Sequence, residues 1–438
     1  MINETTPSPS TATAPSTSTM TTATATAPAT TTSTATQYDR TLDFKDLLMS
    51  GLSTTVGVGI FVILSNVIAN ARGFSWISML ITGIMVLFTT FSYAELSSIY
   101  NKNSTEFEYI RDITNEPIAL IVTTFIILLD ILVLSTVTIG FGNHLSFLTN
   151  LDPMKISVAS ILIFNYINFL GIRKTVNFSH IALLIKLFAM GILIVIGLYN
   201  IDTSKLFEKN IGVQNIMNGS MYALFAYLGF SHIINLTEES VQPEKDIPKA
   251  LIYTVSIVTI LYTLITVVSI MTPNLDNLAK SQVPLADVSK YLLGNKYGQL
   301  FFVVLAIIAL ADSLLMNSVS SSRYVHGMLE RFIPNFSQID LHPTNKTPFL
   351  SILIVVGIVL TFIFTLKDTK YTSLYGDVIA LISLILVNSA AIILRYKEPI
   401  KKRNYRMPLN IGEFPILSFL GLTTSSYILY KYMYMNVI

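Results

Sequence analysis

The sequence predicts an all-α membrane protein with about eleven transmembrane helices. Of its 438 residues, 52% are hydrophobic and only 12% are charged, which is about half the charged fraction of a soluble domain. The hydrophobic residues gather in long runs, such as 118–129, 187–198 and 349–364. A run of about 20 apolar residues crosses a bilayer as a helix, and these runs lack the alternation of a barrel strand. Helical spans are therefore expected, with the lipid bilayer as a partner.

Composition and motifs also exclude several classes of protein. The net charge of +2 gives no indication of a nucleic-acid partner. The absence of cysteine excludes disulfides and cysteine-based metal sites. The five histidines are isolated, and no nucleophile elbow, metal-ligand cluster or phosphate-binding loop is visible. We therefore expect neither an enzyme nor a bound metal or cofactor.

The chain divides into three parts by composition. Residues 1–38 are rich in Ser, Thr, Ala and Pro, which predicts a disordered cytoplasmic tail because such a tract buries too little apolar surface to fold. Residues 39–396 hold ten spans, and residues 397–438 add a basic cytoplasmic loop and one further span. The eleven expected spans are 47–70, 75–99, 117–141, 154–171, 178–199, 215–236, 249–271, 298–322, 348–366, 373–395 and 412–434.

Positive charge predicts the orientation of these spans. With the N-terminus in the cytoplasm, most of the 28 Lys and Arg residues fall in cytoplasmic segments, most densely between Arg395 and Arg406. Cytoplasmic loops of membrane proteins carry this excess. A cytoplasmic N-terminus is expected, in the plasma membrane rather than an internal one.

Glycines interrupt two spans that would otherwise be continuous. Gly57 and Gly59 lie in the middle of the first span, and Gly229 lies in the middle of the sixth. Glycine lowers helix propensity and lets a ligand approach the backbone, although small residues also serve close helix packing. Broken helices at matching positions of two halves indicate a substrate site at the membrane midplane. Their places, first and sixth, predict an internal repeat of five plus five spans.

Three charges lie within spans, where each costs at least about 2.5 kcal/mol at the bilayer centre. Asp130 and Lys186 have apolar neighbours in the sequence, so each should face a cavity or a partner. Lys186 has no obvious counter-ion nearby in the sequence. Asp312 could instead lie near a span end and be solvated, as could Asp377.

Several segments together resemble the amino acid–polyamine–organocation superfamily of transporters, over about residues 45–410. They are Gly57–Phe61, Tyr93–Ser97, Phe225–Phe230 with Asp246–Ala250, Ser321–Tyr324, and Leu394–Tyr396 with Arg406–Leu409. Within the superfamily, the cationic amino acid transporter branch looks most similar. The chain departs from the family's pattern at Ser53 and Val58 and in ending after eleven spans.

The resemblance implies a LeuT-like inverted repeat with spans 1 and 6 discontinuous, and it implies where substrate binds. Free N–H groups near Val58 would receive an α-carboxylate, and carbonyls near Thr55 and in 225–228 would receive an α-ammonium. The expected substrate-binding residues are Thr55, Val56, Gly57, Val58, Gly59, Asp130, Phe225, Ala226, Tyr227, Leu228, Gly229 and Phe230. Asp130 would pair with a cationic side chain, or be a paired structural carboxylate.

The resemblance also implies a coupling lysine at Lys186. Its protonation would hold span 1 to span 8, with Ser313 and Asn317 as the expected neighbours. The alternative, a lysine that reaches along span 5 to the membrane interface, is less favoured. We thus expect a proton-coupled secondary transporter that moves amino acids, cationic ones among the candidates, by alternating access. A polyamine or amino acid exchanger and a non-transporting amino acid sensor are the alternatives.

Overall fold

A computed structural model describes residues 38–437 except 58, 101–104, 200–201, 203–205, 207–211, 295 and 367–368. The chain divides into two units, 1–35 and 36–438, and all described residues lie in the second. The predicted disorder of residues 1–38 therefore lies outside the described residues, except at Tyr38. That side chain is buried, with its ring edge-on to His326 at 5.4 Å between centroids.

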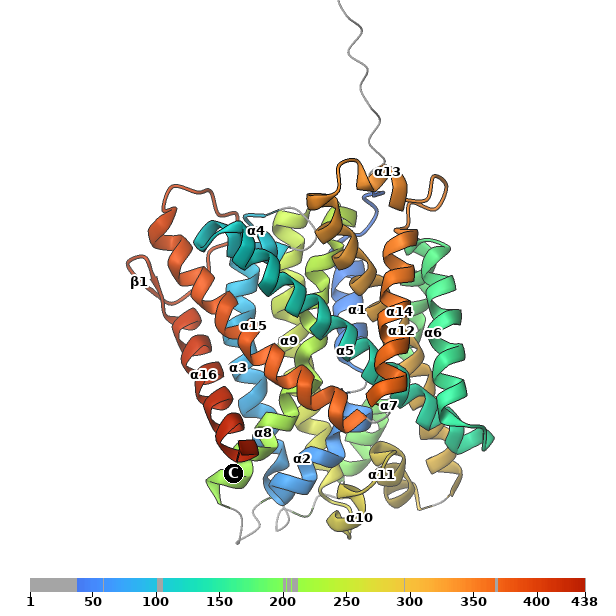
Figure 1. The fold of residues 1–438 in the computed structure, drawn as a ribbon. Coiled ribbons are helices and arrows are strands. Elements are labelled where there is room, and N and C mark those ends of the chain that lie inside the picture. The colour runs from blue at the N-terminus through green and yellow to red at the C-terminus, as the bar shows by residue number, and fades with distance from the viewer. Residues whose placement is uncertain are drawn as a thin grey trace, which may run out of the picture. The chain divides into compact units, whose positions relative to one another are not determined.

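The described residues are almost entirely helical (Figure 1). The α-helices are α1 (Phe44–Thr55), α2 (Leu64–Ala71), α3 (Ser75–Ser97), α4 (Thr105–Ile113), α5 (Glu116–Thr149), α6 (Pro153–Phe169), α7 (Ile172–Tyr199), α8 (Val213–Tyr227), α9 (Pro243–Ser269), α10 (Leu275–Ala279), α11 (Pro284–Leu293), α12 (Lys296–Phe332), α13 (Phe336–Asp340), α14 (Phe349–Leu366), α15 (Thr369–Lys397) and α16 (Ile416–Val437). A π-helix, η1 (Gly59–Ile63), leads into α2, and two 3₁₀-helices, η2 (Arg72–Phe74) and η4 (Leu228–Glu239), follow α2 and α8. Strands β1 (Asn410–Ile411) and β2 (Phe414–Pro415) form a small antiparallel hairpin.

Helices occur at each of the eleven expected spans. Seven helical stretches in the described residues are long and apolar enough to cross a membrane, and the first of them, Phe44–Ser97, contains two expected spans. Local signals set where the helices begin. Asp43 caps α1 by accepting a hydrogen bond from the Asp46 N–H at 2.9 Å, and Asn115 caps α5 just before Pro117. The prediction of a helical multi-span protein is confirmed.

The first and sixth spans are both interrupted as α-helices. α1 ends at Thr55, Val56 leaves helical geometry with φ −79° and ψ 80°, and the wider turns of η1 begin at Gly59. α8 ends at Tyr227 and tightens into η4, which runs for 12 residues to Glu239. An uninterrupted 3₁₀ stretch of this length is uncommon. The sixth span thus continues as a 3₁₀-helix and does not open into a loop.

The helices pack in a pattern that recurs five spans later. The first span contacts the sixth through α1 with η4 and η1 with α8, the second contacts the seventh through α3 with α9, and the third contacts the eighth through α5 with α12. The fourth span packs on the eighth (α6 with α12), just as the ninth packs on the third (α14 with α5). In Figure 1, α4 and α13 lie at one end of the bundle, and α10 and α11 lie at the other.

A buried arginine ties α15 to α3 and to the segment that leads into α16. Arg395 makes a two-pronged contact with Glu95, with Nε–Oε1 at 2.8 Å and Nη2–Oε2 at 2.5 Å. Its Nη1 donates to the Asn410 side chain at 2.6 Å, and the Met407 N–H donates to Glu95 at 2.9 Å. All three nitrogens of the guanidinium thus donate hydrogen bonds at this point.

We expect Arg395→Ala to destabilise the purified protein strongly. The substitution leaves the Glu95 carboxylate buried, 1% exposed, without its main partner, a loss of about 3–5 kcal/mol. Thermal unfolding in detergent measures the effect, and Arg406→Ala, which removes an exposed ion pair with Glu413, is the matched control. Equal melting temperatures for the two variants would contradict this prediction.

Candidate substrate and coupling site

The site is built around the C-terminal turn of α1, where the helix stops and its carbonyl groups lose their helical partners. The Ser53 carbonyl accepts hydrogen bonds from Lys186 Nζ on α7 at 3.0 Å and from Ser313 Oγ on α12 at 2.9 Å. Two residues later, the Thr55 carbonyl accepts from the Gly57 N–H at 2.9 Å. The break in the first span is therefore held by side chains of the fifth and eighth spans.

Lys186 forms a buried ion pair that the sequence did not predict. Its Nζ lies 2.7 Å from Asp312 Oδ2, and both side chains are fully buried. The Ser53 hydroxyl donates to the same carboxylate oxygen, and the Ser179 hydroxyl donates to Ser53 Oγ at 2.7 Å. The partner of Lys186 is therefore Asp312, which is 126 residues away in the chain and so was not visible as a counter-ion in the local sequence.

The structure also decides between the other expectations for Lys186 and the residues around it. A side chain with no exposed surface that points at α12 does not reach toward the membrane interface. Asp312 is not solvated at a span end, since it lies within α12 and is fully buried. Ser313 meets Lys186 only through the shared Ser53 carbonyl, and Asn317 donates to the Ser313 carbonyl at 2.6 Å instead.

The three glycines of the broken spans are contact points between spans. A Cβ on Gly57 would lie 2.0 Å from Ser313 Oγ, and one on Gly59 would lie 2.4 Å from the Ala226 Cα. A Cβ on Gly229 would lie 2.5 Å from the Thr54 carbonyl oxygen. Thr54 Oγ1 also donates to the Gly229 carbonyl at 2.8 Å. In this conformation the glycines serve the close packing of the first span on the sixth and eighth.

Tyr262 on α9 joins the two broken spans. Its hydroxyl lies 2.7 Å from the Thr55 carbonyl oxygen and 3.3 Å from that of Ala226. These are two of the carbonyls expected to receive a substrate ammonium. Tyr262 was not predicted from the sequence. It could have been found as a phenolic hydroxyl in the middle of the seventh span, because a buried O–H requires a hydrogen-bond partner.

The remaining expected binding residues are buried near this point, except one. Tyr227 donates from its hydroxyl to the Met79 carbonyl at 3.0 Å, and Phe230 packs edge-on against Tyr93 at 5.6 Å between ring centroids. The other side chains of the set, all buried, are Val56, Phe225, Ala226 and Leu228. Val58 lies outside the described residues.

Asp130 on α5 pairs with a histidine of η4. Its Oδ1 lies 3.1 Å from His232 Nε2, and both side chains are buried. The second carboxylate oxygen, Oδ2, has no hydrogen-bond partner among the described residues. Asp130 is therefore held in place by η4 and keeps one free acceptor.

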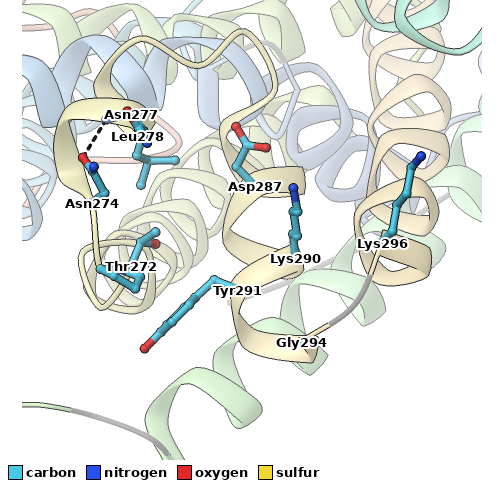
Figure 2. Close-up of a pocket in the computed structure, with 10 residues that line it drawn as sticks. Thr272, Asn274, Asn277, Leu278, Asp287, Lys290, Tyr291, Gly294 and Lys296 are labelled. Atoms are coloured by element: carbon cyan, nitrogen blue, oxygen red, sulfur yellow. Dashed lines mark hydrogen bonds between the residues drawn. The ribbon is translucent and has the colours of Figure 1, made fainter.

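Two cavities lie toward the α10–α11 end of the bundle. One, of about 410 Å³, is lined by the segment after α10, by Val62 of η1 and by Gly140 of α5, so its lining includes the part of the first span that follows the break. The other, of about 680 Å³, lies where α9, α10, α11 and α12 connect. Figure 2 shows that Asp287, Lys290 and Tyr291 line it from one helix, α11.

Comparison with known protein families shows which family the chain belongs to. Residues 42–435 match the amino acid permease family, which covers both broken spans, the Lys186–Asp312 pair and α16. The chain belongs to the amino acid permease family. Members of this family are transporters and not enzymes, so this permease is a multi-pass membrane protein of amino acid transport. The resemblance to the superfamily is confirmed.

The similar proteins carry several different substrates in their names. The branched-chain amino acid permease BcaP of Bacillus subtilis is 24% identical over 395 residues, covering 84% of each chain. The methylthioribose transporter of the same organism is 26% identical over 404 residues, covering 86% of each chain. Cationic amino acid transporter 5 of Arabidopsis thaliana is 25% identical over 336 residues, covering 72% of this permease and 58% of the plant protein.

Proposed function

We propose that this permease is a secondary active transporter that moves amino acids by alternating access, coupled to protons at Lys186 and Asp312. The observation that carries the proposal is the fully buried ion pair at the break of the first span. A charge pair of this kind inside a membrane protein marks an ion or proton pathway more often than it adds stability.

The five-plus-five inverted repeat is part of the proposal. It is supported by the packing, in which spans 1, 2 and 3 contact spans 6, 7 and 8, and contacts of one half recur in the other. Because five is odd, matching spans of the two halves run in opposite directions. In such repeats the substrate binds between the two discontinuous spans, which here are α1–η1 and α8–η4.

Coupling follows from what Lys186 holds together. The protonated amine donates to the Ser53 carbonyl of α1 and to the Asp312 carboxylate of α12, so it links the first, fifth and eighth spans. Loss of the proton removes the positive charge of the donor from both hydrogen bonds, which weakens them because charge-assisted bonds are roughly twice as strong as neutral ones. The neutral lysine would let α1 and α12 separate, whereas protonation would join them again.

The proposed substrate contacts are those of the two broken spans. The N–H groups that begin η1 at Gly59 would receive the α-carboxylate, and the carbonyls of Thr55 and Ala226 would receive the α-ammonium. Because Tyr262 already donates to both carbonyls, an arriving ammonium must share them with its hydroxyl or displace it. We therefore propose that Tyr262 holds the two spans together when the site is empty.

Uptake of radiolabelled amino acids and polyamines into proteoliposomes tests this function. Accumulation of an amino acid against its gradient is expected under an inward proton gradient in sodium-free buffer. Exchange without net accumulation would instead favour an exchanger, and binding without uptake would favour a sensor. The excess of Lys and Arg at the α4–α13 end supports a cytoplasmic N-terminus, and we propose the plasma membrane as its location.

We propose that Asp130 selects for a cationic side chain, because its Oδ2 is a free buried acceptor. Asp130→Asn removes the charge at nearly constant volume, so lysine and arginine uptake should fall more than leucine uptake. The size of the effect is about 10- to 150-fold if one charge-assisted hydrogen bond is lost. His232→Gln, which keeps a polar partner for Asp130, is the control. An equal fall for cationic and neutral substrates would make Asp130 a structural partner of His232.

A further inference from the structure

A buried histidine faces the 410 Å³ cavity with a free hydrogen-bond acceptor. His144 lines this cavity from α5 and is only 1% exposed. Its Nδ1 lies 2.9 Å from the Gly140 carbonyl oxygen, which can only accept, so Nδ1 carries the proton. In the neutral ring Nε2 is then an acceptor. Among the described residues Nε2 has no hydrogen-bond partner, and it is not one of the fully buried unpaired atoms, so it is accessible from the cavity that His144 lines.

The rest of the cavity supplies the opposite charge and further hydrogen-bonding groups. Lys280, exposed at the end of α10, is the one cation of the described lining, and no described carboxylate lines the cavity. Asn143 and Tyr222 add an amide and a phenol. A cavity that offers an acceptor at a buried position and a positive charge near its mouth matches a molecule with an ammonium and a carboxylate.

From this geometry we infer a second amino acid site, in which His144 Nε2 accepts from the α-ammonium and Lys280 attracts the α-carboxylate. The lining residue Val62 belongs to η1, where the second half of span 1 begins. The site would therefore hold an amino acid at the α10–α11 end, next to the α1–η4 site. This inference rests on the proposed transport of amino acids and adds a second place where they bind.

Ligand binding to the purified full-length protein tests the inference. Each standard amino acid is screened for a rise in melting temperature, and the most stabilising one is then titrated. His144→Phe and Lys280→Gln should each raise its apparent Kd about five- to tenfold, the loss of roughly one hydrogen bond or ion contact. Tyr291→Phe and Lys290→Gln, which alter the neighbouring cavity of Figure 2, should leave the Kd unchanged.

Substrate analogues assign each contact. The 2-hydroxy acid analogue lacks the ammonium, so His144→Phe should not weaken its binding further. The decarboxylated amine lacks the carboxylate, so Lys280→Gln should not weaken its binding. Equal losses for all three ligands would mean that the variants only disturb the fold. That outcome overturns the site, as does a wild type that no amino acid stabilises, which would leave water as the partner of Nε2.

The lysine variant keeps the test decisive if His144→Phe does not fold, because Lys280 is exposed and makes no ion pair among the described residues. The site also fails separately from the transport proposal. Binding that depends on His144 and Lys280 without any uptake would retain the second site and reject transport. Uptake together with an unchanged Kd in both variants would retain the transport proposal and reject the second site.

Discussion

Lys186→Ala is expected to remove the dependence of uptake on the proton gradient. Wild-type uptake should rise as external pH falls and should need no sodium. Without the amine, the contacts left between Ser53 of α1 and α12 are those of the Ser53 and Ser313 hydroxyls. These carry no titratable proton in this range, so protonation can no longer strengthen the link between α1 and α12. The measurement is initial uptake against external pH in sodium-free proteoliposomes. Lys186→Arg should fail as well, because a guanidinium does not release its proton in this range.

Controls separate coupling from simple loss of structure. Lys155→Ala, at an exposed position near the start of α6, should behave as wild type. Asp312→Asn leaves a buried lysine without its partner, which costs about 3–5 kcal/mol, so both coupling and melting temperature should fall. The double variant Lys186→Met with Asp312→Asn should regain stability but not pH dependence. Retained pH stimulation in Lys186→Ala would assign coupling to another group.

The sequence predicted the positions of the spans and of their interruptions because both depend on local chemistry. Apolar runs mark spans wherever they occur, and glycine at 57, 59 and 229 weakens a helix whatever surrounds it. The short helices α4, α10, α11 and α13 were not predicted, since hydropathy runs reveal only segments long enough to cross a bilayer. That η4 would tighten into a 3₁₀-helix was also not predicted, because the contacts of Gly229 with α1 are tertiary.

The sequence predicted which residues belong to the site better than it predicted which of them pair with one another. The family resemblance placed Lys186 beside Ser313 and Asn317 of the eighth span, but the pairing with Asp312 at 2.7 Å was not predicted. Asp130 was likewise singled out without His232, which lies 102 residues away. Tyr262 and His144 were missed altogether because Tyr262 is one of 21 tyrosines and His144 is an isolated histidine that belongs to no recognised motif. Only the contacts of their polar atoms make them distinctive.

Gly229→Ala should nearly abolish transport. The added Cβ would meet the Thr54 carbonyl oxygen at 2.5 Å and its carbon at 2.6 Å. These are backbone atoms, which cannot rotate away as a side chain would, so η4 must move off α1 and lose the Thr54–Gly229 hydrogen bond. Overpacking of this kind costs about 1–3 kcal/mol, or about 5- to 150-fold in rate if the strain falls on the transporting states.

The matched control for Gly229→Ala is Gly191→Ala on α7, where an added Cβ meets no atom within 4 Å. It should transport as wild type does. Melting temperature then distinguishes the two roles proposed for Gly229. A contact needed only for packing should lower melting temperature together with transport, whereas a place where substrate approaches the backbone should lose binding at nearly normal melting temperature. Near-normal uptake by Gly229→Ala would show that α1 and η4 need not stay in contact for transport.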